Sequence, residues 1–161
     1  MFRKFNLKTE IILAVMPATM IISVLMLLEI FTSQKLLFSS LASSAFLIYM
    51  DPKHPTNRVR TLIIAQISAA LIGYLIFILL GPGYLSAAIS MIIAIIVMIS
   101  AKAMHPPAVS SAMIFAFQYT KPNTLMLFMM AVLLLVMLIV LQKLSLWVLK
   151  KADKENVAEE I

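Results

Sequence analysis

Six apolar segments, separated by short polar stretches, follow one another along the chain. Four can cross a hydrocarbon core of about 30 Å as helices that rise about 1.5 Å per residue: residues 11–31, 59–80, 84–101 and 124–149. Residues 36–50 and 105–118 are too short for this, so each is predicted to join an extended stretch to a partial helix. The order is long, short, long, then the turn "GPG" at residues 81–83, then long, short, long.

This order indicates an internal repeat. A shift of 67 residues lays "ASSAFLI" (residues 42–48) on "VSSAMIF" (residues 109–115) and aligns the segments of one half with those of the other. Each half, residues 11–80 and 84–149, has three crossings, an odd number, so the halves are predicted to lie in the bilayer with opposite orientations. The sequence therefore predicts an all-α membrane protein in which six hydrophobic segments form two inverted repeats of three, each with one short broken or half helix.

The composition and the basic residues agree with a membrane location. Of the 161 residues, 63% are hydrophobic and 12% are charged, whereas an average soluble domain is about half apolar and about a quarter charged. With six crossings and a cytoplasmic N-terminus, eleven basic residues lie inside and two, Lys35 and Lys121, outside. If only the four long segments crossed, seven would lie inside and six outside. The positive-inside tendency therefore favours a multi-pass protein of the cell membrane with cytoplasmic ends at residues 1–10 and 150–161.

The stretch "KAMHPPAVSS" (residues 102–111) places a polar cluster directly before an apolar run. Pro106 and Pro107 lack N–H donors and are tolerated at a helix start, so a short helix is predicted to begin near Ala108. Its first-turn N–H groups would be unpaired and, at membrane depth, would have to be buried in protein or line an aqueous cavity. In the other half, Ser43 and Ser44 lie near the equivalent start.

Two half-helices that enter from opposite sides would bring their N-termini together near the midplane of the membrane. Each terminus carries roughly +0.5 elementary charge, and helix N-termini often bind anions, so a small anion suits this place. The predicted substrate-binding residues are His105, Pro106, Pro107, Ser110, Ser111, Ser43 and Ser44. Lys102 on the inner approach, with Arg58 and Arg60 as a cytoplasmic vestibule, would attract the anion.

Each of these residues also has a purely structural interpretation. Lys102 can extend to the inner headgroups, and His105 can cap a helix or make an interhelical hydrogen bond. The serines can act with neighbouring alanines as small residues that let helices pack closely, and the arginines can serve only as orientation signals. Neither a metal nor a cofactor is expected, because cysteine is absent and His54, His105 and the scattered carboxylates show no ligand spacing.

At these residues the chain resembles the HPP family of small integral membrane proteins, which is named for the triplet found here at residues 105–107. The resemblance extends from about residue 39 to residue 116. It rests on the triplet, on the small-residue runs "LASSAF" (residues 41–46) and "AVSSAM" (residues 108–113), and on a polar loop with Pro55 and Arg60. Plant and cyanobacterial members are associated with nitrite transport, so the resemblance implies a small monovalent anion as substrate.

One position departs from the family pattern. Gln66 stands where family members often carry a histidine, so the resemblance implies no proton-linked role there. We nevertheless count Gln66 among the predicted pathway residues.

The leading functional hypothesis is a channel or transporter for a small monovalent anion, nitrite-like, and not an enzyme. One alternative is a membrane scaffold or assembly subunit without a pathway. Another is an intramembrane enzyme that uses His105 as a base, although no nucleophile or second acid–base partner has a motif around it. The expected partners are the lipid bilayer and the small anion, and nucleic acid is not expected. Whether the chain forms a homo-oligomer is left open.

The topology can be tested directly because the chain has no cysteine. We expect single cysteines at Lys53 and in residues 150–161 to react with a membrane-impermeant maleimide from the cytoplasm, and a cysteine at Lys121 to react from outside. Labelling of Lys121→Cys and of the C-terminal end from the same side would rule out the inverted repeat.

Overall fold

The structure is a computed structural model that describes residues 37–117 and 124–159, with isolated positions between residues 11 and 26. Its helices are α2 (Leu37–Met50), the short 3₁₀ helix η1 (Pro55–Asn57), α3 (Val59–Leu80), α4 (Tyr84–Ser100), α5 (Pro107–Ala116) and α6 (Thr124–Glu159). The described part of the chain contains helices and no strand, which confirms the all-α part of the predicted fold class. The predicted segment 11–31 and the terminus 1–10 fall largely or wholly outside the described residues.

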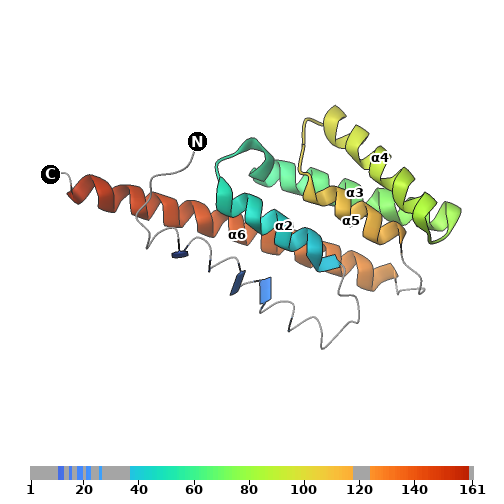
Figure 1. The fold of residues 1–161 in the computed structure, drawn as a ribbon, viewed down its shortest axis with the longest axis horizontal. Helices are drawn as coiled ribbons and strands as arrows, with labels where there is room; N and C mark the ends of the chain where they lie inside the picture. The colour runs from blue at the N-terminus through green and yellow to red at the C-terminus, as the bar shows by residue number, and fades with distance from the viewer. Residues whose placement is uncertain are drawn as a thin grey trace.

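Successive described helices alternate in direction. In Figure 1, α3 and α5 run one way, while α2, α4 and α6 run the other way. The connections from α2 to α3 and from α4 to α5 consequently lie at one end of the bundle, and the turn from α3 to α4 lies at the opposite end. Lys53, Arg58, Arg60 and Lys102 all belong to the first end, which we call the basic end.

Two of the described helices meet the length and hydropathy needed to cross a membrane. They are α3 over its whole length and Val132–Lys151 within α6. The other apolar helices of the described chain are shorter, with 17 residues in α4, 14 in α2 and 10 in α5. The bounds of α3 coincide with the predicted segment 59–80, and α4 ends one residue before the predicted limit.

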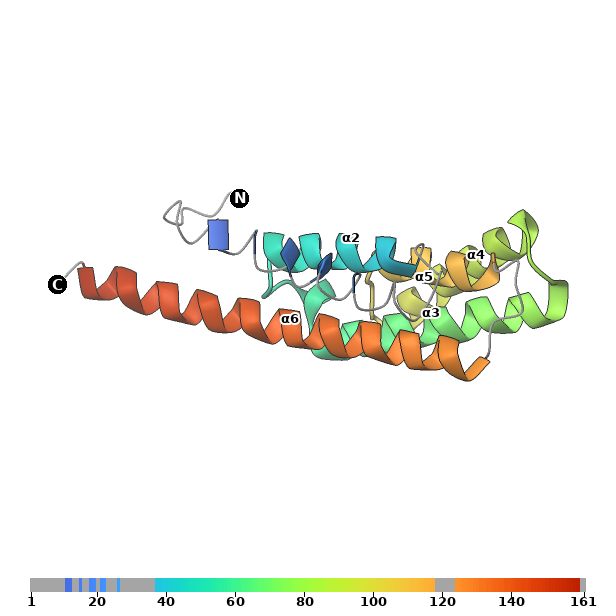
Figure 2. The same cartoon turned by 90° about the horizontal axis from the view of Figure 1, so that it is seen from below.

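The helix α6 is longer than predicted. Hydropathy placed its end at residue 149, with a solvated tail beyond, but the helix continues to Glu159 and projects past the other helices toward the C-terminus (Figure 2). Residues 150–159 are rich in alanine, lysine and glutamate, which favour helix without any apolar partner. The loss of hydrophobicity at Lys150 therefore ends the apolar surface and not the helix.

Small residues let α3 and α5 cross closely. Ala65, Ala69 and Gly73 follow one another at four-residue spacing on α3, as Ala108 and Ala112 do on α5, and all five are buried. Residues four apart share one face of a helix, so each helix presents a smooth stripe to the other. A Cβ atom on Gly73 would overlap the Ala112 carbonyl oxygen and lie 2.7 Å from the Phe115 Cβ atom, so this position has room for glycine alone.

We expect Gly73→Ala to destabilise the protein by about 1–3 kcal/mol, because the added methyl group forces α3 and α5 apart. The measurement is thermal or SDS-induced unfolding in detergent, followed by circular dichroism. Leu71→Ala, which alters the exposed side of the same helix, is the matched control and should change stability much less. Equal stability of Gly73→Ala and the wild type would contradict the close crossing.

Candidate functional site

His105 reaches the interior because of the way α4 ends. The Ala103 N–H donates to the Met98 carbonyl at 2.9 Å, and the Lys102 N–H donates to the Ile99 carbonyl at 3.1 Å. This pair of bonds is a Schellman motif, with Lys102 at the position of positive φ (51°) that glycine usually takes. The turn directs the chain from α4 back toward the helices, and His105 follows two residues after the buried Ala103.

The imidazole of His105 connects three parts of the chain. Its side chain is fully buried, with 0% exposure. The ring Nδ1 lies 3.0 Å from the main-chain carbonyl oxygen of Thr56 in η1, and Nε2 lies 2.9 Å from the hydroxyl oxygen of Ser44 in α2. His105 was predicted as a substrate contact or, in its structural interpretation, as a residue that makes interhelical hydrogen bonds. Its contacts with Ser44 and Thr56 are of the second kind.

The environment of His105 determines its tautomer and its charge. A carbonyl oxygen only accepts, so Nδ1 must carry a hydrogen. His105 lies in the connection between α4 and α5, outside the helices, and burial lowers its pKa to about 4, while the bond to Thr56 acts in the opposite direction. At neutral pH the ring is therefore uncharged, with its hydrogen on Nδ1.

A second set of hydrogen bonds extends the site into α3. The Ser111 hydroxyl on α5 lies 2.9 Å from Gln66 Oε1 on α3 and 3.0 Å from the Ser40 hydroxyl on α2. The Ser44 hydroxyl donates to the Ser40 carbonyl at 2.8 Å, which joins the two sets. We call the five buried residues His105, Ser44, Ser40, Ser111 and Gln66 the polar cluster.

Gln66 is incompletely satisfied within this cluster. Its side chain is 7% exposed, and Nε2 has no hydrogen-bond partner among the described residues. Exchange of the amide oxygen and nitrogen, which are assigned from the hydrogen-bond network, would only move the unpaired atom to the other position. One polar atom of Gln66 therefore stays buried without a partner, at a cost that sites of ligand binding often carry.

The remaining predicted binding residues line a different feature. Ser43, Pro106, Pro107 and Ser110, with apolar residues of α2, surround an open groove of about 590 Å³ between α2 and the start of α5. Ser43 precedes Ser44 and Pro106 follows His105, so the groove adjoins the polar cluster. The seven predicted substrate residues are thus divided between a buried cluster and a groove beside it.

Two predictions about helix ends are wrong. The first-turn N–H groups of α5 are not free, because Ala108 donates to the His105 carbonyl at 2.9 Å and Val109 to the Pro106 carbonyl at 3.1 Å. The tight turn through the prolines supplies these acceptors locally. Backbone donors at this helix start are consequently unavailable to a ligand, and the hydroxyl, imidazole and amide groups are the polar groups that remain.

The two short helices also do not meet end to end. Ser40 pairs with Ser111, and four residues later Ser44 pairs with His105, so α2 and α5 lie antiparallel and side by side. Side-by-side packing buries Ser40 and Ser44 on α2 and Ser111 on α5, whereas an end-to-end meeting would leave them uncovered. The helix α2 begins at Leu37, before the serines near which it was predicted to start. Within the helix, the Ser44 hydroxyl is satisfied by its hydrogen bond to the Ser40 carbonyl four residues earlier.

The three predicted vestibule cations lie outside the cluster. Arg58, Arg60 and Lys102 are exposed at the basic end, where the connections enclosing His105 also lie. Gln66, by contrast, is part of the cluster. No group of three or more potential metal ligands occurs within the described part of the chain.

Sequence reasoning placed Ser40 near the start of the first short helix but not among the substrate-binding residues, and it assigned no role to Thr56. Ser40 and Ser44 share one face of α2 because they are four residues apart, so their spacing was a usable signal. Thr56 acts through its main-chain carbonyl, which leaves no trace in the sequence.

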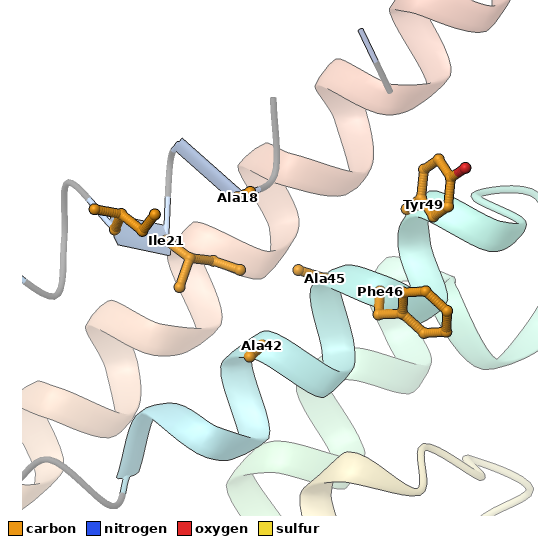
Figure 3. A pocket seen from close by; sticks show the side chains of 7 residues that line it. Ala18, Ile21, Ala42, Ala45, Phe46 and Tyr49 are labelled. Atoms are coloured by element: carbon orange, nitrogen blue, oxygen red, sulfur yellow. The ribbon is translucent and has the colours of Figure 1, made fainter. Parts of the chain in front are cut away.

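A second, apolar pocket lies along α2 and shares Ala42 and Phe46 with the groove. It has a volume of about 400 Å³ and is lined by Ala18, Ile21, Ile22, Ala42, Ala45, Phe46 and Tyr49 (Figure 3). Its lining offers almost no polar group, so it does not resemble a site for an ion.

Comparison with known proteins identifies one match. The family model described as "HPP, transmembrane region" matches residues 4–154. No curated protein and no solved structure matches the chain significantly.

The burial of neutral His105 predicts a pH-dependent stability. The unfolded chain, with a histidine pKa of about 6.5, binds the proton more tightly than the folded protein, in which the pKa is about 4. In anion-free buffer this residue's contribution is therefore complete above about pH 6.5 and is lost as the pH falls toward 4, by up to about 1.4 kcal/mol per pH unit.

The check is unfolding in detergent at pH 7 and pH 5. His105→Asn should unfold more easily at pH 7 and should remove most of the difference between the two pH values. His54→Asn keeps an acceptor at the N-cap of η1 and should retain the wild-type difference. The assignment fails if His105→Asn shows the same pH dependence as the wild type.

Proposed function

Because the chain belongs to the HPP family of transmembrane proteins, we propose that it carries a small monovalent anion, such as nitrite, across the cell membrane beside the interface of α2 and α5. The observation that carries this proposal is the polar cluster, in which side chains from α2, α3 and α5 converge with a buried histidine. Buried polar groups are expensive in a membrane protein and are commonly retained for function.

The chemistry of the cluster and the groove favours an anion over a cation. Hydroxyl, amide and imidazole groups can donate hydrogen bonds to an anion. The start of α5 adds the positive end of a helix dipole, although its first N–H groups are paired. Cation pathways use rings of carboxylates or backbone carbonyls, and no carboxylate takes part in the hydrogen bonds of the cluster.

The basic end would supply the approach to the site. Arg58, Arg60 and Lys102 are exposed there and would raise the local concentration of anions. From this end an anion would enter the open groove and reach Ser43 and Ser110, with the polar cluster directly behind.

The proposal includes the topology of two inverted repeats with six crossings, both termini being cytoplasmic. The alternating helix directions and the gathering of described basic residues at one end support it. Under the shift of 67 residues Ser44 corresponds to Ser111, so the pairing of α2 with α5 would join equivalent elements of the two halves.

We propose no enzymatic activity. Both ring nitrogens of His105 are engaged, by Thr56 and Ser44, and neither partner supplies a carboxylate that would orient a catalytic base. A scaffold without a pathway is the alternative that flux measurements would favour if they found no transport.

Proteoliposome flux tests this function. Nitrite and other small monovalent anions should pass much better than sodium or potassium. Ser110→Ala removes one donor that lines the groove, and a lost hydrogen bond to a charged group costs about 1.5–3 kcal/mol, so apparent affinity should fall roughly ten- to a hundredfold. Ser44→Ala removes the hydrogen-bond partner of His105 Nε2 and should also lower the apparent affinity. Lys102→Asn should reduce the rate of entry mainly at low salt, because asparagine tolerates the positive φ of this position while removing the charge.

Ser100→Ala is the matched control, since the Ser100 hydroxyl is exposed and bonds only within α4. Its flux should equal that of the wild type. Equal passage of cations and anions, or unchanged anion flux in both folded site serine variants, would contradict the proposal.

A further inference from the structure

When His105 is neutral, one close contact of the polar cluster is left without a hydrogen. Because Nδ1 carries the hydrogen donated to Thr56, Nε2 of a neutral ring can only accept, and its partner Ser44 would have to donate. The same Ser44 hydroxyl is 2.8 Å from the Ser40 carbonyl, which also only accepts. One hydroxyl hydrogen thus faces two acceptors at hydrogen-bonding distance.

A doubly protonated ring removes this conflict. Nε2–H then donates to the Ser44 oxygen at 2.9 Å, and Ser44 donates to the Ser40 carbonyl. Every close contact of His105 and Ser44 receives one hydrogen, and no heavy atom has to move. The heavy-atom geometry therefore matches the imidazolium, although burial without a counter-charge disfavours it.

The surroundings of the ring explain why the charged form needs a partner. The described titratable or charged side chains on the neighbouring elements are Tyr49 on α2, Asp51, Lys53, His54 and Arg58 in the connection to α3, Arg60 and Tyr74 on α3, Tyr84 on α4, Lys102 before the ring, and Lys143, Lys150 and Lys151 on α6. None of them makes a hydrogen bond to the imidazole, whose nitrogens are bonded to Ser44 and Thr56. Most are cationic, so they oppose a further positive charge, and a bound anion would offset it.

The groove places such an anion next to the ring. Pro106 and Ser43, which line the groove, are the immediate sequence neighbours of His105 and Ser44. The buried, unpartnered amide atom of Gln66 lies in the same cluster, through Ser111. A negative charge in the groove would act on His105 through protein of low polarity, where electrostatic interactions are strong.

Resting on the proposed function, we propose that His105 binds a proton at Nε2 when the anion occupies the groove, so that the protein moves one proton together with one anion. The proton comes from the aqueous phase on the side of entry and is released on the other side when the anion leaves. The coupling is reciprocal. A proton on His105 raises the affinity for the anion, and a bound anion raises the affinity of His105 for the proton by the same factor.

The charge of His105 can be observed directly. The chain has two histidines, so His54→Asn leaves His105 alone, and the histidine ¹⁵N chemical shifts of the reconstituted protein report its tautomer and its charge. Without nitrite at pH 6 the ring should be neutral with hydrogen on Nδ1. Saturating sodium nitrite should convert it to the imidazolium, and the apparent Kd for nitrite should fall by up to about tenfold per pH unit between pH 7 and pH 5.

Two variants separate coupling from a structural role. Ser44→Ala removes the oxygen that receives the Nε2 hydrogen and should abolish the nitrite-induced change of the shifts while leaving the Thr56 bond. His105→Asn should bind nitrite with no pH dependence over this range, and an inward proton gradient should no longer drive uptake. Ser100→Ala should behave as the wild type in each measurement.

The outcomes distinguish the two proposals. Nitrite flux with a ring that stays neutral would overturn proton coupling and leave anion transport standing. Flux that is equally pH-dependent in His105→Asn would place the proton on another group and would also overturn the inference. If no small monovalent anion is bound or carried, both proposals fail.

Discussion

The close approach of α3 and α5 is the contact on which the rest of the site depends. Without side-chain volume at Gly73, and with alanine on the facing turns, the backbones of the two helices come near enough for Ser111 to reach Gln66 at 2.9 Å. In lipid, no hydrophobic effect drives helices together, so close packing of this kind stabilises their association. The position of α5 then determines where His105, two residues before its start, can be, and Ser44 of α2 and Thr56 of η1 contact that ring.

Residues that begin or end helices explain which elements could be predicted. The limits of α3 were predicted correctly, because its apolar run is bounded by arginine on one side and by Gly81-Pro82-Gly83 on the other. The start of α5 followed from its two prolines. The end of α6 was not predicted, because hydropathy reports the end of the apolar surface, while helix propensity carries the backbone further.

The sequence singled out four members of the polar cluster, but it predicted their geometry less well. A histidine and several serines stand out in an apolar chain from the sequence alone, and the structure brings His105, Ser44, Ser111 and Gln66 together. The antiparallel overlap of α2 and α5 depends on tertiary packing and has no local signal. The paired N–H groups at the start of α5 depend on the path of the connection, which the triplet constrains but does not specify.

These differences change the physical basis of the anion recognition that we propose. A site built from helix termini would rely on backbone donors, which are fixed in direction once the helix is formed. Here the available donors are side chains on three helices, and hydroxyl hydrogens can rotate without displacement of heavy atoms. The small-residue contact keeps α3 and α5 in place, while the hydrogens of Ser44 and Ser111 can choose between two acceptors each. A rigid frame and rotatable hydroxyl groups would together permit the proposed change of protonation state without movement of the helices. This is the property that a small site needs if it is to bind and release a charged solute within an apolar protein.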